Sequence, residues 1–261
     1  MRDYVNLNTC FYWLMEAYMH IKDINRAITM AEKSDLFDAL NQMYDNLPEG
    51  QCGGCTACCR ESVPTFFIEY INIVNYFKDD KRLFEELWPK LMDFYFTELT
   101  EKKGCPFLDE QDRCSIYAVR PLPCRLFGFS SYEEYEDNLK AVEKGNREVK
   151  KYYKNAFNMV LPDAVVEYKV PFCTDFVPER TIGTDERLDY SDVLFGLDSR
   201  FLMSGILDPE MINMTLIHWF AFMAYDEDDA GDMRIQISQE ILENGTSKTL
   251  RKALKSLAPK I

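Results

Sequence analysis

Nine cysteines are the residues of this chain most capable of chemistry, and eight of them have surroundings typical of metal ligands. The first group is the run "CGGCTACC" at residues 52–59, in which three cysteines are each two residues apart and the last is doubled. A loop with this spacing can wrap thiolates around one metal ion or one face of a cluster. The candidate ligands are Cys52, Cys55, Cys58, Cys59, Cys105, Cys114, Cys124 and Cys173.

The doubled pair suggests more than one metal atom. Adjacent side chains are expected to diverge, so Cys58 and Cys59 are predicted to serve different metals of one cluster, or two sites. Eight thiols would complete two four-thiolate sites, and the spacing alone does not choose between zinc and an iron–sulfur cluster. Cys10 stands apart in an apolar helical context and is predicted to be a buried residue.

The two cysteine groups together resemble the YkgJ-type cysteine-cluster family, a zinc- or iron-chelating domain that is shared with flagellin lysine N-methylases. The matching elements, within residues 52–130, are the CxxCxxCC run, "GCPFL" from Gly104, "CSIY" from Cys114 and "RPLPCRLF" from Arg120. The resemblance implies a cytoplasmic metalloprotein with one or two iron–sulfur clusters, of the 4Fe–4S type by preference, and zinc as the alternative. It further implies a redox reaction, or a cluster-assisted modification of a peptide, a protein or a small substrate.

Three arginines accompany the cysteines in an otherwise acidic chain. Arg60, Arg120 and Arg125 are predicted to bind near the cofactor, where their charge would offset the thiolates and raise the reduction potential of a cluster. The alternative is that they pair with carboxylates and fix the loops.

The fold class predicted is mainly α, with an irregular cysteine-rich core in loops flanked by helices and at most a small β element. Apolar periodicity predicts helices at residues 8–46, 64–80, 81–102, 131–160, 189–205, 208–225, 232–245 and 248–261. The pair of helices between residues 64 and 102 is expected to return the second cysteine group to the first. Pro64 is predicted at a helix N1 position, Asp208 as an N-cap, and Gly145 as a break. Residues 164–172 are the clearest strand candidate.

Three segments are predicted within one compact domain. They are an N-terminal helical extension at 1–48, the cysteine-cluster metal-binding core at 49–176, and a C-terminal helical region at 177–261. The acidic run "DEDDAGD" at 226–232 is predicted to be a solvated turn between helices.

Charge and composition limit the partners. The formal net charge is −14, which repels phosphate backbones and anionic lipid, so neither nucleic acid nor membrane is an expected partner. The apolar run at 214–225 is too short to cross a bilayer core of about 30 Å. A cytoplasmic location is expected, where clustered thiols indicate metal or redox chemistry rather than disulfides. The candidate partners are a protein or peptide substrate and a redox partner.

Catalytic motifs are few. The chain has no P-loop, no GxGxxG, no nucleophile elbow and no CxxxCxxC, and His20 and His218 lie in apolar helical contexts typical of packed histidines. An iron–sulfur oxidoreductase or peptide-modifying enzyme is one hypothesis. A zinc-stapled interaction module without chemistry at the metal is the second, and a metal-free thiol redox sensor is the third.

Overall fold

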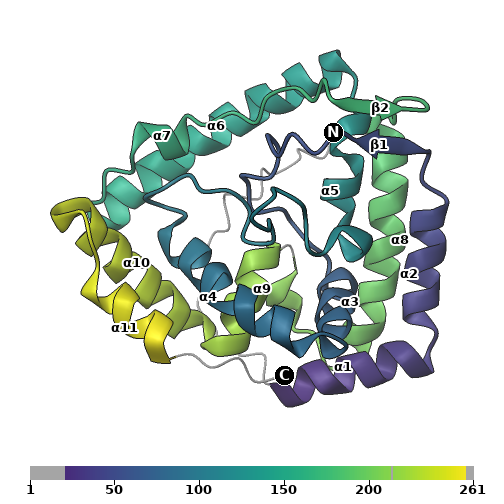
Figure 1. Ribbon diagram of the computed structural model, residues 1–261, viewed down its shortest axis with the longest axis horizontal. Coiled ribbons are helices and arrows are strands. Elements are labelled where there is room, and N and C mark those ends of the chain that lie inside the picture. Colours follow the sequence, from purple (N-terminus) through teal and green to yellow (C-terminus); the bar gives the residue numbers. More distant parts are fainter. Residues whose placement is uncertain (1–20, 213, 257–261) are drawn as a thin grey trace.

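The computed structural model describes residues 21–212 and 214–256 of the chain. Cys10 and His20 therefore lie outside the described residues. The mainly α prediction is confirmed, because the described residues form eleven α-helices and one two-stranded sheet (Figure 1). The helices are α1 (Ile21–Lys33), α2 (Leu36–Asp45), α3 (Phe67–Lys78), α4 (Lys81–Thr97), α5 (Leu122–Leu126), α6 (Tyr132–Phe157), α7 (Asp163–Val166), α8 (Thr184–Met203), α9 (Leu216–Ala224), α10 (Glu227–Asn244) and α11 (Lys248–Ser256). The strands are β1 (Gly50–Cys52) and β2 (Phe176–Pro178).

Helix α9 is the centre of the main core. Its sequence is apolar almost throughout, and it packs against α4, α10 and α3, as Figure 1 shows. Trp219 of α9 stacks on Tyr70 of α3 with ring centroids 5.4 Å apart, and both side chains are buried. This core also includes buried residues of α1, α2, α8 and α11, so all three predicted segments contribute to it.

Helix α3 starts later than the sequence predicts. Pro64 is not at its N1 position but forms an isolated antiparallel bridge with Thr215, and α3 begins at Phe67. The buried carboxylate of Asp198, from α8, accepts the backbone N–H groups of Phe67 and Ile68 at 2.8 Å each. These are two of the donors that a helix start leaves unpaired. The cap comes from a residue 131 positions away, which explains why local sequence did not indicate it.

The prediction of a strand at residues 164–172 is wrong. Its first residues belong to the short helix α7, and the rest is not strand. Val166 is buried in a small second core with Leu99, Met159 and Leu161, against partly buried residues of α6. The apolar side chain of Val166 is therefore buried by a short helix rather than by a strand, and the β element lies elsewhere, between β1 and β2.

Several helix boundaries also differ from the predictions. Gly145 is buried within an unbroken α6, so the predicted break is wrong. The acidic run at 226–232 is not a turn, because Asp226 caps α10 by accepting the N–H of Asp229 at 2.8 Å. Asp208 caps only a short 3-10 turn at Pro209–Met211, and α9 starts at Leu216. The helical pattern at 8–46 contains, in its described part, two helices separated near Asp35, which has a φ of 54°.

Candidate metal centre

The first cysteine group is held against the segment that carries Cys173 by the small sheet. Strand β1 ends at Cys52, which pairs with Phe176 of β2, and the N–H of Gly53 donates to the carbonyl of Asp175 at 2.9 Å. A Cβ at Gly53 would lie 2.6 Å from that carbonyl oxygen, so the close approach requires glycine. This pairing places Cys173 near the CxxCxxCC run, although more than a hundred residues separate them.

The second group is held by a hairpin and by one backbone contact with the first group. Leu108 and Cys114 form an antiparallel bridge around the turn at 109–113, in which Asp109 N–H donates to the carbonyl of Arg113 at 2.9 Å. The N–H of Cys105 donates to the carbonyl of Cys59 at 2.7 Å. The hairpin thus fixes Cys105 and Cys114 beside the doubled cysteine.

Cys124 lies in α5, not in a loop, and a buried carboxylate fixes the start of that helix. Glu69 of α3 is completely buried, and its Oε1 accepts the N–H of Leu122 and the hydroxyl of Tyr44, both at 2.5 Å. Its Oε2 accepts the N–H of Phe66 at 3.0 Å. Burial raises the pKa of Glu69 to about 7, against the opposing effect of these donors. Glu69 therefore joins α2, α3 and α5 behind Cys124.

Replacement of this carboxylate is expected to loosen the support of Cys124. In the variant Glu69→Gln, one oxygen becomes an NH₂ group that faces backbone or hydroxyl donors, and a buried unsatisfied pair results. We expect a loss of about 2 kcal/mol in the free energy of unfolding, measured by urea denaturation. The matched control is Glu134→Gln, where the glutamate caps the half-exposed start of α6. Equal losses in the two variants would contradict the role of Glu69.

All eight candidate ligands line one cavity with a volume of about 510 Å³. Apolar side chains complete its wall, including Val63, Phe94, Phe107 and Ile116. Cys52, Cys55 and Cys124 are exposed, the other five are partly buried, and none of the eight forms a disulfide. The predicted convergence of the two groups after the helical excursion through α3 and α4 is thus present in the structure.

The two adjacent thiols do not diverge as predicted. Cys58 and Cys59 both line the cavity. The interaction between the two thiols lowers the pKa of Cys58 to about 7, with further help from the Arg120 charge, and it raises the pKa of Cys59. The doubled cysteine therefore does not by itself require two separate sites.

Electrostatic coupling shows which thiols are neighbours. Burial raises the pKa of Cys105 to about 12 and that of Cys124 well above its usual value, and in both cases Cys114 and Cys58 add to the rise. Burial also raises the pKa of Cys173, with contributions from Cys55, Cys58 and Cys52. Cys124 is exposed only in that it lines the cavity, and the surrounding protein still desolvates its thiolate. Cys58 thus affects the pKa of Cys105, Cys124 and Cys173, and Cys52 affects that of Cys114, so the thiols around the cavity form one connected group.

Arg120 is the candidate arginine on the cavity wall. Its guanidinium lies 4.0 Å from the centroid of the Tyr117 ring, and its Nε is buried without a hydrogen-bond partner. Arg60 is exposed and is not among the lining residues. Arg125 lies 3.8 Å over the Tyr44 ring and donates to the carbonyls of Arg120 and Ala118, at 2.8 and 2.6 Å. Arg125 thus makes contacts that fix the loop, which was the alternative to a role in cofactor binding.

These residues fit a thiolate-bound group of negative charge. Eight thiols face one space, and a cationic side chain with an unsatisfied buried nitrogen lies among them. In the described part of the chain, no three His, Cys, Asp or Glu side chains are already grouped to hold a metal ion. The thiols surround the cavity rather than converge on one point. A single zinc ion would have to bring four sulfurs to within about 2.3 Å of itself.

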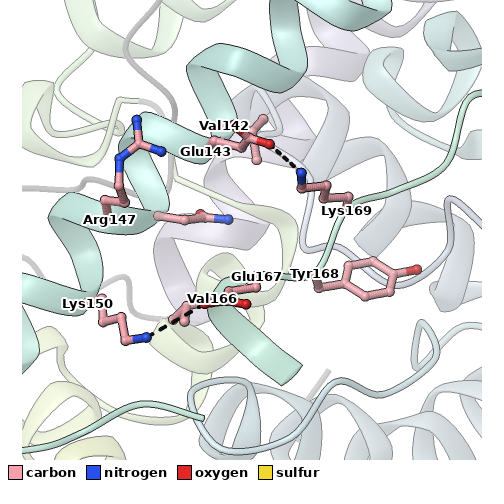
Figure 2. Close-up of a pocket in the computed structure, with 9 residues that line it drawn as sticks. Val142, Glu143, Arg147, Lys150, Val166, Glu167, Tyr168 and Lys169 are labelled. Atoms are coloured by element: carbon pink, nitrogen blue, oxygen red, sulfur yellow. Dashed lines mark hydrogen bonds and ion pairs between the residues drawn. The ribbon is translucent and has the colours of Figure 1, made fainter. Parts of the chain in front are cut away.

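A second cavity, of about 300 Å³, lies beside α6 (Figure 2). Its wall carries both signs of charge: Glu143 forms an ion pair with Lys169, and Nζ of Lys150 lies 3.9 Å from a carboxylate oxygen of Glu167 (Figure 2). Tyr168 lines it as well, and its hydroxyl donates to the carbonyl of Ala57, between Cys55 and Cys58, at 3.3 Å. The two cavities are thus connected through one hydrogen bond to the CxxCxxCC loop.

The fold and site together define a helical protein with a thiol-lined cavity suited to a metal centre. Residues 51–151 match the family model CxxCxxCC, described as "Putative zinc- or iron-chelating domain", which confirms the resemblance seen in the sequence. The match covers the CxxCxxCC run, the hairpin and α5, but it ends before Cys173. No curated protein and no solved structure matches the chain. Within the described residues, no helix is both long and apolar enough to cross a membrane.

Proposed function

We propose that this protein binds one or two iron–sulfur clusters, of the 4Fe–4S type by preference, in the thiol-lined cavity. The observation that carries the proposal is the convergence of eight thiols and Arg120 on one open space of about 510 Å³. Structural zinc sites would need the thiolates gathered into small closed tetrahedra, whereas the eight thiols here line one larger space. A cluster uses several thiolates at once and carries net negative charge, which Arg120 would offset.

The chain's own residues would supply ligation, orientation and charge balance. The cysteines of the loop, the hairpin and α5 would provide the thiolates, and Glu69 would keep α5 in place. Arg120 would stabilise the more negative, reduced form and so raise the reduction potential. When bound, a cluster of this kind supplies one-electron transfer, or Lewis acidity where one iron lacks a protein thiolate.

For the reaction, we propose electron transfer or a cluster-assisted modification, in the cytoplasm, with a protein or peptide as substrate or redox partner. The support is that two of the thiols on the cavity wall, Cys52 and Cys55, are solvent-exposed. A macromolecule could therefore approach the centre without unfolding the protein. The acidic surface argues against nucleic acid or anionic lipid as this partner.

Metal and sulfide analysis of anaerobically purified protein tests the proposal. The expected result is a brown protein with broad visible absorption, and with iron and acid-labile sulfide in similar amounts. A colourless protein that holds stoichiometric zinc and no sulfide would overturn it in favour of a zinc-stapled module. Reversible disulfides without any metal would favour the thiol sensor instead.

A further inference from the structure

A chain of polar side chains, two of them buried and three partly buried, runs from the wall of the thiol-lined cavity into the helical core. Ser62, which lines the cavity, has its Oγ 2.6 Å from Oγ1 of Thr215. Thr215 Oγ1 lies 2.7 Å from Nδ1 of His218, and Nε2 of His218 lies 3.1 Å from Nη1 of Arg234. Arg234 then donates to Glu98 at 2.8 Å. Thr215 and Arg234 are buried, with 6% and 7% of their surface exposed.

The backbone already holds these segments together without the side chains. Pro64 and Thr215 form a bridge, Leu216 N–H donates to the carbonyl of Val63 at 2.9 Å, and Thr65 N–H donates to that of Met214 at 3.0 Å. Thr215 precedes α9, but its hydroxyl makes no cap hydrogen bond to that helix. Since buried polar groups cost free energy unless they are satisfied, a connected chain that includes the buried Thr215 and Arg234 calls for a function.

Arg234 sets the direction of the hydrogen bonds. A guanidinium only donates, so Nε2 of His218 must accept and the neutral ring must carry its proton on Nδ1. The ring then donates from Nδ1 to Thr215. Thr215 retains its own hydroxyl proton, and the Ser62 oxygen lies close enough to accept a hydrogen bond from it. Hydroxyl protons rotate freely, so either oxygen of the Ser62–Thr215 pair can donate.

We propose that Ser62 is a positioning residue that donates a hydrogen bond to the anionic group bound in the cavity, with Thr215 and His218 orienting its proton. Without an anion, Ser62 donates to Thr215. When an anion is bound, both hydroxyl protons rotate, so that Thr215 donates to Ser62 and Ser62 donates to the anion in the cavity. No heavy atom has to move. A hydrogen bond to sulfide or thiolate sulfur stabilises the more negative, reduced form.

This inference rests on the proposed function, and its test is the midpoint potential of anaerobically reconstituted protein, followed by visible absorption or EPR. In Ser62→Ala, iron and sulfide contents should match the wild type, while the equilibrium for reduction should fall about tenfold, which is about 59 mV for one electron. Thr215→Val should shift the potential in the same direction. Ser62→Thr, which keeps the hydroxyl, should restore the wild-type value.

The control is Ser191→Ala, whose hydroxyl donates to the carbonyl of Arg187 within α8 and does not line the cavity. Its potential should equal that of the wild type. An unchanged potential in Ser62→Ala with a full cluster overturns the inference while the proposed function stands. If Ser62→Ala fails to assemble a cluster, Thr215→Val decides, because it leaves Ser62 in place. Wild-type protein without iron and sulfide would instead overturn the proposed function, and the inference with it.

Discussion

Replacement of Cys58 by serine is expected to lower bound metal at least tenfold in anaerobically purified protein. The reason is its central place among the thiols of the cavity: it interacts with the adjacent Cys59, and its charge raises the pKa of Cys105, Cys124 and Cys173. Its loss would therefore affect several ligands at once. Because the binding free energy of a thiolate metal site is large, the loss of one shared ligand should weaken binding by several kcal/mol.

Three further variants are compared with Cys58→Ser. Cys173→Ser should lose less metal than Cys58→Ser, since Cys173 is less buried and its pKa is affected by Cys55, Cys58 and Cys52, whereas Cys58 affects the pKa of three other thiols. Cys10→Ser is the control and should retain wild-type iron and sulfide. A Cys58→Ser protein with the full metal content would contradict the central place given to this residue. Equal losses in Cys58→Ser and Cys59→Ser would indicate that the adjacent pair acts as one ligand unit.

The sequence predicts the parts of the site that local spacing determines. The CxxCxxCC run, the second cysteine group and the helices around α3 and α4 all follow from residue types at short range. Ligation by the eight cysteines remains a prediction, but their meeting at one cavity is a feature of the fold. The mainly α class was predictable for the same reason, because apolar periodicity is a local property.

The parts that were not predicted depend on contacts between distant residues. Asp198 caps α3 from 131 positions away, Glu69 supports α5 from 53 positions away, and Ser62 meets Thr215 across 153 positions. None of these contacts has a local sequence signal. An aspartate, glutamate or serine has the same neighbours in sequence whether its side chain is buried or on the surface. The predicted strand at 164–172 failed for a related reason: burial of Val166 against α6 produces the same apolar pattern as a strand.

His218 gives the second large expected effect, on stability in acid. The prediction that it is a packed histidine is confirmed: its ring lies edge-on to Tyr95, with centroids 5.3 Å apart, and its nitrogens contact Thr215 and Arg234. Burial, with the nearby Arg234 charge, lowers the pKa of His218 from about 6.5 to about 3. The charged groups around it are Arg234 of α10 and Glu98, the residue that follows α4, which pair with each other, and Glu61, which pairs with Lys102 and interacts with Glu98.

The sign of the pH effect follows from this lowered pKa. Between pH 3 and 6.5 the unfolded chain binds a proton at His218 and the native protein does not, so unfolding takes up a proton. The stability held by the neutral ring is complete above pH 6.5 and is lost as the pH falls towards 3. Over the interval from pH 6.5 to 5 this amounts to about 2 kcal/mol.

The measurement is urea unfolding of wild type and His218→Gln across pH 5 to 7. Glutamine does not titrate, so the free energy of unfolding of the variant should decline less towards pH 5 than that of the wild type, by about 2 kcal/mol. Comparing the two proteins cancels the acid lability of any thiolate site, because both contain the same cysteines. Parallel curves for wild type and His218→Gln would show that His218 is protonated in the native protein, and the hydrogen-bond direction assigned from Arg234 to the cavity would then be wrong.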